Sequence, residues 1–148
     1  MEPDDLPSRG RFVGREHRFP VRVYFEDTDL SGVVYHANYL RYMERARSDM
    51  LAVAGIDQRA AWEAREGVYV VADLHIRYRS SARLDDMLIV TSHLTKWTAA
   101  SATIHQRVML GPRVLTEADV LAVFVADGGG KPRRQPRAWL DIFAGLLE

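Results

Sequence analysis

The chain has no cysteine among its 148 residues. This absence excludes a disulfide framework, a thiolate nucleophile and a zinc site built on cysteine ligands. It also fits a reducing compartment, and the acidic start Met1-Glu2-Pro3-Asp4-Asp5 does not resemble a signal peptide. We therefore expect a cytoplasmic protein.

Long apolar runs and an excess of charge of either sign are also lacking. No apolar stretch approaches the length of a membrane span, so we expect no transmembrane segment. Lysine and arginine number 20, and so do aspartate and glutamate, so no general attraction to nucleic acid is implied. Hydrophobic residues make up 47% of the chain, which is typical of a globular domain with a sizeable core.

The periodicity of apolar residues divides the chain into an arm and one domain. Residues 1–17 carry proline, glycine and mixed charge without periodicity, so we expect a flexible N-terminal arm before a single domain over 18–148. Alternation over 21–26 predicts a strand. The spacing of apolar residues from 39 to 55 predicts an amphipathic helix that ends at Gly55.

After Gly67 the apolar period changes from helical to two. Residues 68–79 alternate and predict a half-buried strand. Further strands are predicted at 87–96, 101–110 and 114–126, with short helices at 57–66 and 139–147. One strand, one long helix and then a run of strands predict an α+β fold with an antiparallel sheet against the helix.

The most informative segment, residues 25–39, joins the first predicted strand to the long helix. It carries Asp27, Asp29, Gly32 and His36. A helix N-terminus stabilises negative charge through its free N–H groups, so this elbow can place reactive side chains beside a developing oxyanion.

Three interpretations of this segment are open. A calcium loop would start at Asp27, but its twelfth position is Asn38, where a bidentate glutamate is needed. Aspartate and threonine are also ordinary turn and capping residues, and a lone histidine is often simply packed or solvated. The third interpretation is an acyl-transfer site, with Asp29 as base or nucleophile and His36 close by.

The stretch from Val21 to Arg47 resembles the 4-hydroxybenzoyl-CoA thioesterase family of hotdog-fold proteins. The resemblance rests on Glu-Asp-Thr-Asp, Gly-Val-Val-Tyr-His-Ala-Asn-Tyr and Glu-Arg-Ala-Arg, and it is greatest to the branch associated with the bacterial Tol-Pal envelope system. A weaker resemblance extends over Phe19 to Arg137. It implies a hotdog fold, in which a curved antiparallel sheet wraps a long central helix.

The resemblance also implies site residues. It places the catalytic carboxylate at Asp29 and the site histidine at His36, with a carbonyl-polarising N–H at or next to His36, so Tyr35 and His36 are expected to position the oxyanion. The residues alone do not choose between Asp27 and Asp29, which share a face if the chain stays extended, and Asp27 could instead bond to the turn backbone. No metal and no cofactor are expected, since coenzyme A is part of the substrate.

Basic residues are the candidates for binding the phosphates of coenzyme A. Some relatives carry them after a tryptophan, but Trp97 is followed here by Thr98-Ala99-Ala100-Ser101. A tyrosine that the family often has is replaced by Phe25. The run 131–137 fits a solvated tail, coenzyme A phosphates, acyl carrier protein or an acidic lipid surface. The phosphate-binding candidates are Arg77, Arg79, Arg83, Lys131, Arg133 and Arg134.

We therefore expect an acyl-CoA thioesterase that yields a carboxylic acid and free coenzyme A. The alternative is a catalytically weak hotdog module that binds acyl carrier protein or envelope-associated partners. An open sheet edge is stabilised by pairing with another chain, so a homodimer or homotetramer with sites shared between subunits is expected.

Glu44 and Arg47, three residues apart on the helix, are expected to form a local ion pair.

Overall fold

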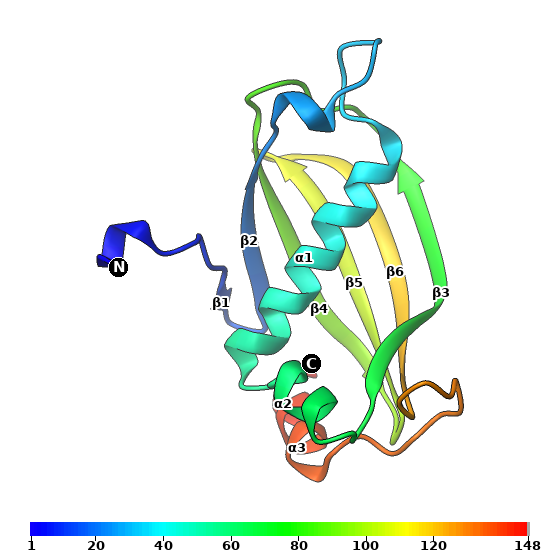
Figure 1. The fold of residues 1–148 in the computed structure, drawn as a ribbon. Helices are drawn as coiled ribbons and strands as arrows, with labels where there is room; N and C mark the ends of the chain where they lie inside the picture. The colour runs from blue at the N-terminus through cyan, green and yellow to red at the C-terminus, as the bar shows by residue number, and fades with distance from the viewer. Residues whose placement is uncertain (148) are drawn as a thin grey trace.

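The computed structural model describes residues 1–147 and has one long helix, α1, packed on one face of a six-stranded antiparallel sheet (Figure 1). This is the α+β hotdog architecture that the sequence predicts. The strands are β1 Arg11–Val13, β2 Glu16–Arg22, β3 Val68–Tyr78, β4 Met87–Trp97, β5 Ser101–Leu110 and β6 Arg113–Val125. The helices are α1 His36–Ala54, α2 Gln58–Glu63 and α3 Arg137–Leu146, with 3₁₀ turns η1 Pro3–Asp5 and η2 Phe25–Asp27.

Helix α1 forms because its apolar residues recur at helical spacing and its end is well capped. Tyr39, Met43, Ala46 and Met50 lie on one buried face. Gly55 takes a left-handed conformation with a φ of 99°, and its N–H donates to the carbonyl of Ala52. A residue with a Cβ would be strained there, which explains why the helix ends at a glycine.

The order of strands is β1-β2-β4-β5-β6-β3, so β3 lies at an open edge. Helix α1 packs against β2, β4 and β5 and leaves β3 largely uncovered. The predicted half-burial of this strand is therefore wrong, because most of its residues are exposed on both faces. A bulge between Val71 and Asp73 also interrupts its alternation.

The core has two clusters, one under each half of α1. The upper cluster joins α1 residues such as Tyr42 and Met43 to β2, β4 and β6. The lower cluster is closed by α3, whose Trp139, Leu140 and Phe143 are buried. None of the helices within residues 1–147 combines the length and the apolar character that a membrane span requires.

The N-terminal region differs from the prediction. Strands β1 and β2 pair within the expected arm, and His17 is fully buried. The first strand of the domain therefore begins at Glu16 instead of Val21. It also ends at Arg22, because the chain turns into the 3₁₀ turn at Phe25–Asp27 before the predicted end at residue 26. The remaining predicted strands and both short helices are confirmed within a few residues.

Candidate active site

The elbow between β2 and α1 is a compact double turn. The 3₁₀ turn at Phe25–Asp27 is followed by a narrow loop in which Thr28 bridges to Val34. The N–H of Val34 also donates to the carbonyl of Ala82 at 2.9 Å, which ties the loop to the segment after β3. Because the chain is not extended here, Asp27 and Asp29 do not share a face as they would in a strand.

Asp27 is buried and hydrogen-bonded within the turn. It is 9% exposed, and its Oδ2 accepts a hydrogen bond from the Tyr24 N–H at 2.9 Å. Its carbonyl accepts from the N–H of Tyr35 at 2.9 Å and from the side-chain amide of Asn38 at 2.8 Å. These bonds join the turn to the start of α1.

Asp29, by contrast, presents its carboxylate to solvent. Its Oδ1 accepts from the Ser31 N–H at 2.8 Å and from the Ser31 hydroxyl. Within residues 1–147 its Oδ2 has no hydrogen-bond partner. The bonds from Ser31, aided by attraction to His36, hold the pKa of Asp29 below its ordinary value. The carboxylate is thus ionised and has one oxygen available for chemistry.

His36 is the first residue of α1 and lies between two tyrosines. Its ring centroid is 4.4 Å from that of Tyr35 and 6.1 Å from that of Tyr78. The Tyr78 hydroxyl donates to the His36 carbonyl at 2.9 Å, so β3 contributes to the position of the helix start. The elbow therefore brings Asp29 and His36, the two residues expected to be catalytic, into one exposed site.

The backbone N–H groups at the start of α1 differ in availability. That of Tyr35 is already bonded to Asp27, so the sequence-based expectation that Tyr35 supplies an oxyanion donor is not supported. Those of His36 and Ala37 have no acceptor within residues 1–147. They lie at the positive end of the α1 dipole, where they can stabilise an oxyanion.

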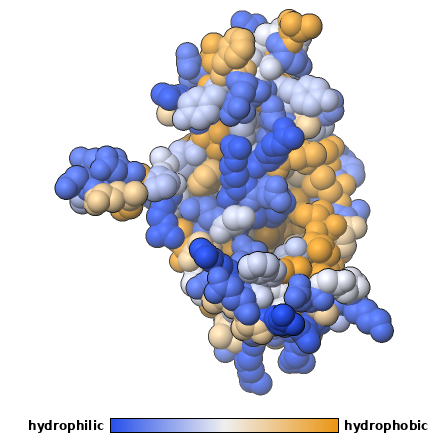
Figure 2. Space-filling view, viewed as in Figure 1, coloured by the Kyte–Doolittle hydropathy of each residue, from blue (hydrophilic) through white to orange (hydrophobic). Residues whose placement is uncertain are grey.

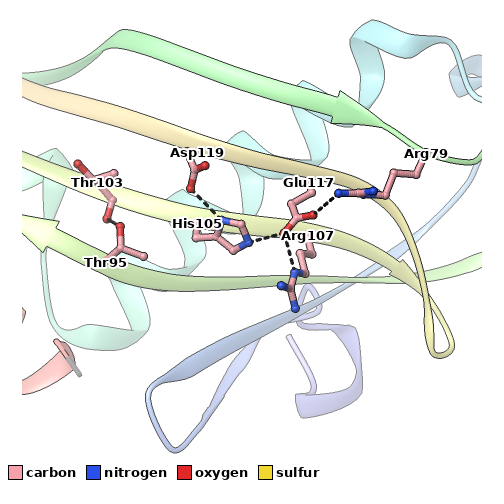
Figure 3. Close-up of polar contacts among 7 residues, drawn as sticks. All are labelled: Arg79, Thr95, Thr103, His105, Arg107, Glu117 and Asp119. Carbon is pink, nitrogen blue, oxygen red and sulfur yellow. Dashed lines mark hydrogen bonds and ion pairs between the residues drawn. The ribbon is translucent and has the colours of Figure 1, made fainter.

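The predicted phosphate-binding arginines near the end of β3 are in different surroundings. Arg79 donates to Glu117 at 3.1 Å on the outer face of the sheet, within a cluster that includes His105, Arg107 and Asp119 (Figure 3). Arg77 pairs in register with Glu117 on that same face. Arg83, whose backbone bridges to Val33 of the elbow loop, is the one of these three beside Asp29.

The other three predicted residues lie far from the elbow. The segment that holds Lys131, Arg133 and Arg134 is at the opposite end of the sheet (Figure 1). Arg133 donates to the carbonyls of Arg65 and Glu66 at 3.0 and 2.8 Å, so its guanidinium has a structural use. Within one subunit these residues do not meet Asp29.

The predicted ion pair between Glu44 and Arg47 is wrong. No ion pair joins them within the described chain, and Arg47 instead donates to the side-chain oxygen of Gln106 at 2.9 Å. Burial lowers the pKa of Arg47, while the nearby Glu44 partly opposes that effect. Both residues line a pocket between α1 and the sheet. Across residues 1–147, no group of three or more histidine, aspartate or glutamate side chains is placed to hold a metal ion.

Three contributors to the site were missed from the sequence. Ser31 could have been recognised as the partner in an Asp-x-Ser turn, since aspartate commonly bonds to the backbone two residues on. The side chain of Asn38 joins Asp27 to α1. The sequence shows a polar residue at this position but gives no sign of its partner. Tyr78 gave no local signal, because its contact with His36 spans 42 residues.

Comparison with known proteins defines the class of this molecule. Residues 23–143 match the model of the thioesterase-like superfamily, and the fold is the hotdog fold of such enzymes. The chain belongs to this superfamily of thioesterases.

Individual relatives agree with that assignment. The chain is 42% identical over 122 residues to the acyl-CoA thioester hydrolase YbgC of Escherichia coli O6:H1, covering 82% of this chain and 90% of that protein. The crystal structure of a probable thioesterase from Bartonella henselae superposes with a TM-score of 0.76 at 34% identity, covering 82% of this chain and 99% of the other. A 4-hydroxybenzoyl CoA thioesterase mutant shares the fold, with a TM-score of 0.75 at 20% identity over 86% of this chain and 98% of its own.

Proposed function

We propose that this thioesterase hydrolyses acyl-CoA thioesters and that Asp29 carries the chemistry. The observation that carries the proposal is the elbow, where a free Asp29 oxygen lies on the same loop as unpaired N–H groups at the start of α1. The similarity to the acyl-CoA thioester hydrolase YbgC of Escherichia coli supports the same substrate class.

The proposed reaction consumes one water and breaks the bond between the acyl carbon and sulfur. Asp29 either takes a proton from water, which attacks the carbonyl, or attacks the carbonyl itself to give a mixed anhydride that water then cleaves. The N–H groups of His36 and Ala37 stabilise the oxyanion, and coenzyme A leaves as a thiol after taking up a proton. The Asp29 carboxylate supplies the base or nucleophile, and the backbone N–H groups stabilise the oxyanion. The proposed mechanism therefore uses no metal.

The two routes differ in the oxygen that the product receives. In a single turnover in ¹⁸O-water, direct attack by water places the label in the released acid. A mixed anhydride cleaved at the Asp29 carbonyl instead leaves the label on the protein. In mass spectrometry, label in the peptide containing Asp29 identifies the mixed anhydride, whereas label in the acid alone shows that water attacked the acyl carbon.

The proposed active form is a homodimer or homotetramer with a site shared between subunits. Strand β3 has an unpaired edge within the described chain and exposes Val71, Leu74 and Tyr78 on its helix-facing side. An open strand of this kind is stabilised by pairing with another chain. A two-fold pairing of β3 strands would place one subunit's pocket beside the other's elbow.

A cytoplasmic location and binding to acyl carrier protein are further parts of this proposal. The competing function is a non-catalytic hotdog module for acyl carrier protein or Tol-Pal partners. An ionised, exposed Asp29 beside free N–H donors favours the enzyme, because a binder needs neither.

A panel of thioesters tests the proposed function. Short aliphatic, aromatic and long-chain acyl-CoA thioesters are incubated with the protein, and free thiol is measured with and without EDTA. We expect turnover of at least one class, unchanged by the chelator. No thiol release from any thioester would overturn the enzyme in favour of the binding module, and loss of activity with EDTA would overturn the metal-free mechanism.

A further inference from the structure

The open edge of β3 carries a charged row on one face and an apolar row on the other. Beyond the bulge that precedes Asp73, the strand alternates regularly up to Tyr78. Asp73, His75 and Arg77 lie on the outer face of the sheet and are exposed. Figure 2 shows apolar surface on the side of the molecule where β3 lies, next to the polar face of α1. The edge therefore offers a partner its backbone and two kinds of side chain.

Asp73 and Arg77 carry opposite charges, and neither forms an ion pair within residues 1–147. On the neighbouring strand β6, Asp73 lies opposite the uncharged Leu121. Arg77 lies opposite Glu117, whose carboxylate is already paired with Arg79. Two opposite charges four positions apart on one face are complementary to a second copy of the same strand that runs antiparallel.

Self-pairing about a two-fold axis near the middle of this stretch has three registers. With the axis at His75, Asp73 lies opposite the partner's Arg77, and symmetry forms this ion pair twice. With the axis at Leu74, Asp73 lies opposite the partner's His75 instead. With the axis at Ile76, His75 lies opposite the partner's Arg77, so two basic side chains meet. Only the axis at His75 gives both Asp73 and Arg77 an opposite charge.

The register about His75 also brings the partner's bulge to the active-site elbow. It sets positions 71 and 72 of the partner opposite positions 79 and 78. Tyr78 belongs to the elbow, because its hydroxyl donates to the His36 carbonyl at 2.9 Å. Val71 is half-exposed and lies on the helix-facing side of the sheet, opposite Ala122 of β6. The partner's Val71 therefore reaches the side on which His36 lies, and β-bulges commonly direct a side chain in this way beside active sites.

We propose that β3 pairs with the β3 of a second copy about a two-fold axis at His75. Asp73 of each subunit forms an ion pair with the partner's Arg77, and the partner's Val71 lines the site beside Tyr78. The proposal rests on the proposed function and adds the register and the residue that the partner contributes. The ion pairs select the register more than they tighten the dimer, because exposed cross-strand charge pairs are weak and like charges opposite one another are destabilising.

Engineered cysteines measure the register directly, because the chain has no cysteine of its own. Opposite residues of an antiparallel pair have Cα atoms about 4.5–5.5 Å apart, which a disulfide spans, whereas separations above about 7 Å are not bridged. Under mild oxidation, we expect His75→Cys to give covalent dimers on non-reducing electrophoresis. Leu74→Cys and Ile76→Cys, each two positions away from its own copy, should stay unlinked. Cross-linking at either of these in place of His75→Cys, or at none of the three, would overturn the register.

Charge reversal tests the ion pairs without cysteines. Asp73→Arg alone and Arg77→Asp alone each set like charges opposite one another twice, so the dimer dissociation constant should rise about tenfold in analytical ultracentrifugation. An equal mixture of the two variants should restore association, because every pair in the mixed dimer is of opposite charge. Asp141→Arg, exposed on α3, makes the same charge change outside β3 and is the control. Dimers that neither variant weakens, or no recovery on mixing, would overturn the ion pairs.

The mixed dimer also shows which subunit supplies Val71 to each site. Its two chains are distinct, so Asp29→Asn and Val71→Trp can be placed on the same chain or on opposite chains. If the partner's Val71 lines each site, opposite chains keep one intact site and about half of the activity, whereas placement on the same chain abolishes it. The reverse result would place Val71 in its own subunit's site and overturn the proposal. Absence of thiol release from the unmodified protein with every acyl-CoA thioester would overturn the proposed function and leave the cross-linked register standing.

Discussion

Asp27 and Asp29 are two positions apart yet have different surroundings. Asp27 is buried and accepts hydrogen bonds from the Tyr24 N–H of the 3₁₀ turn and from the side-chain amide of Asn38 in α1. A serine two residues on holds Asp29, which is exposed at the tip of the loop. The difference follows from the turn at Phe25–Asp27, since an extended chain would have placed both carboxylates alike.

The contact between Ser31 and Asp29 predicts a shift in the pH profile. Hydrogen bonds from Ser31 lower the pKa of Asp29, so the active carboxylate persists below the ordinary value, and activity is lost only as pH falls through the lowered pKa. In Ser31→Ala, the acidic limb of kcat/KM should move upward, toward the ordinary aspartate value of about 3.9. Ser31→Thr, which keeps the hydroxyl, is the control. An unchanged limb in Ser31→Ala would show that another group sets it.

Single residues of the site were predictable where a motif fixes them. Asp29 and His36 stand in an ordered motif and could be proposed from the sequence, and their roles in catalysis stay predictions. The availability of the Tyr35 N–H was not predictable, because it depends on the carbonyl of Asp27 closing the turn. The partner of Arg47 lies on β5, 59 residues away, and no local pattern predicts such a contact.

At the scale of elements, the end of α1 depends on Gly55. Its φ of 99° strains any residue with a Cβ, although the added atom would meet only Ile142 at 3.7 Å. Gly55→Ala should therefore lower the free energy of unfolding by about 1 kcal/mol. Gly145→Ala, within α3 and with open space around it, should be neutral or stabilising. Urea unfolding of both variants checks this, and equal effects would contradict the assigned cap.

The N-terminal hairpin predicts a second dependence on pH. His17 is fully buried, and its Nε2 lies 2.7 Å from Asp49 Oδ2, which also accepts from the Gly10 N–H. Burial lowers the pKa of His17, so the unfolded chain binds a proton more readily than the folded protein. Stability should thus fall as pH drops below about 6.5, and less so in His17→Gln. Urea midpoints at several pH values measure this, and identical profiles would contradict it.

Elements were predictable where their period and end signals are local. Helix α1 and strands β4, β5 and β6 carry clear apolar periods, and their predicted bounds hold within a few residues. The start of β2 was missed because its residues pair with β1 and β4, which lie elsewhere in the chain. Strand β3 alternates in sequence like a half-buried strand, but its burial depends on which face α1 covers.

For the whole molecule, the open edge of β3 predicts association. Dimers or tetramers should persist at the lowest concentration that retains activity, as light scattering during turnover can measure. A fully active monomer would contradict the shared site. Replacement of Leu74 by lysine should weaken association, since a charge would enter the paired apolar face.

Mixing two inactive variants tests whether sites are shared. One carries Asp29→Asn, and the other carries Val71→Trp, which narrows the pocket lining. If the elbow and the pocket of one site come from different subunits, random mixed dimers should regain about a quarter of wild-type activity. No recovery in confirmed mixed dimers would place the complete site within one subunit.

The most direct test of Asp29-dependent hydrolysis is thiol release by Asp29→Asn beside Asp27→Asn. The first change is nearly isosteric at an exposed position, so we expect an intact fold with turnover lower by about 10²-fold or more. The second should cost about 1 kcal/mol of stability and leave most of the turnover. Unchanged turnover in folded Asp29→Asn, or loss of turnover in Asp27→Asn alone, would contradict the proposed mechanism.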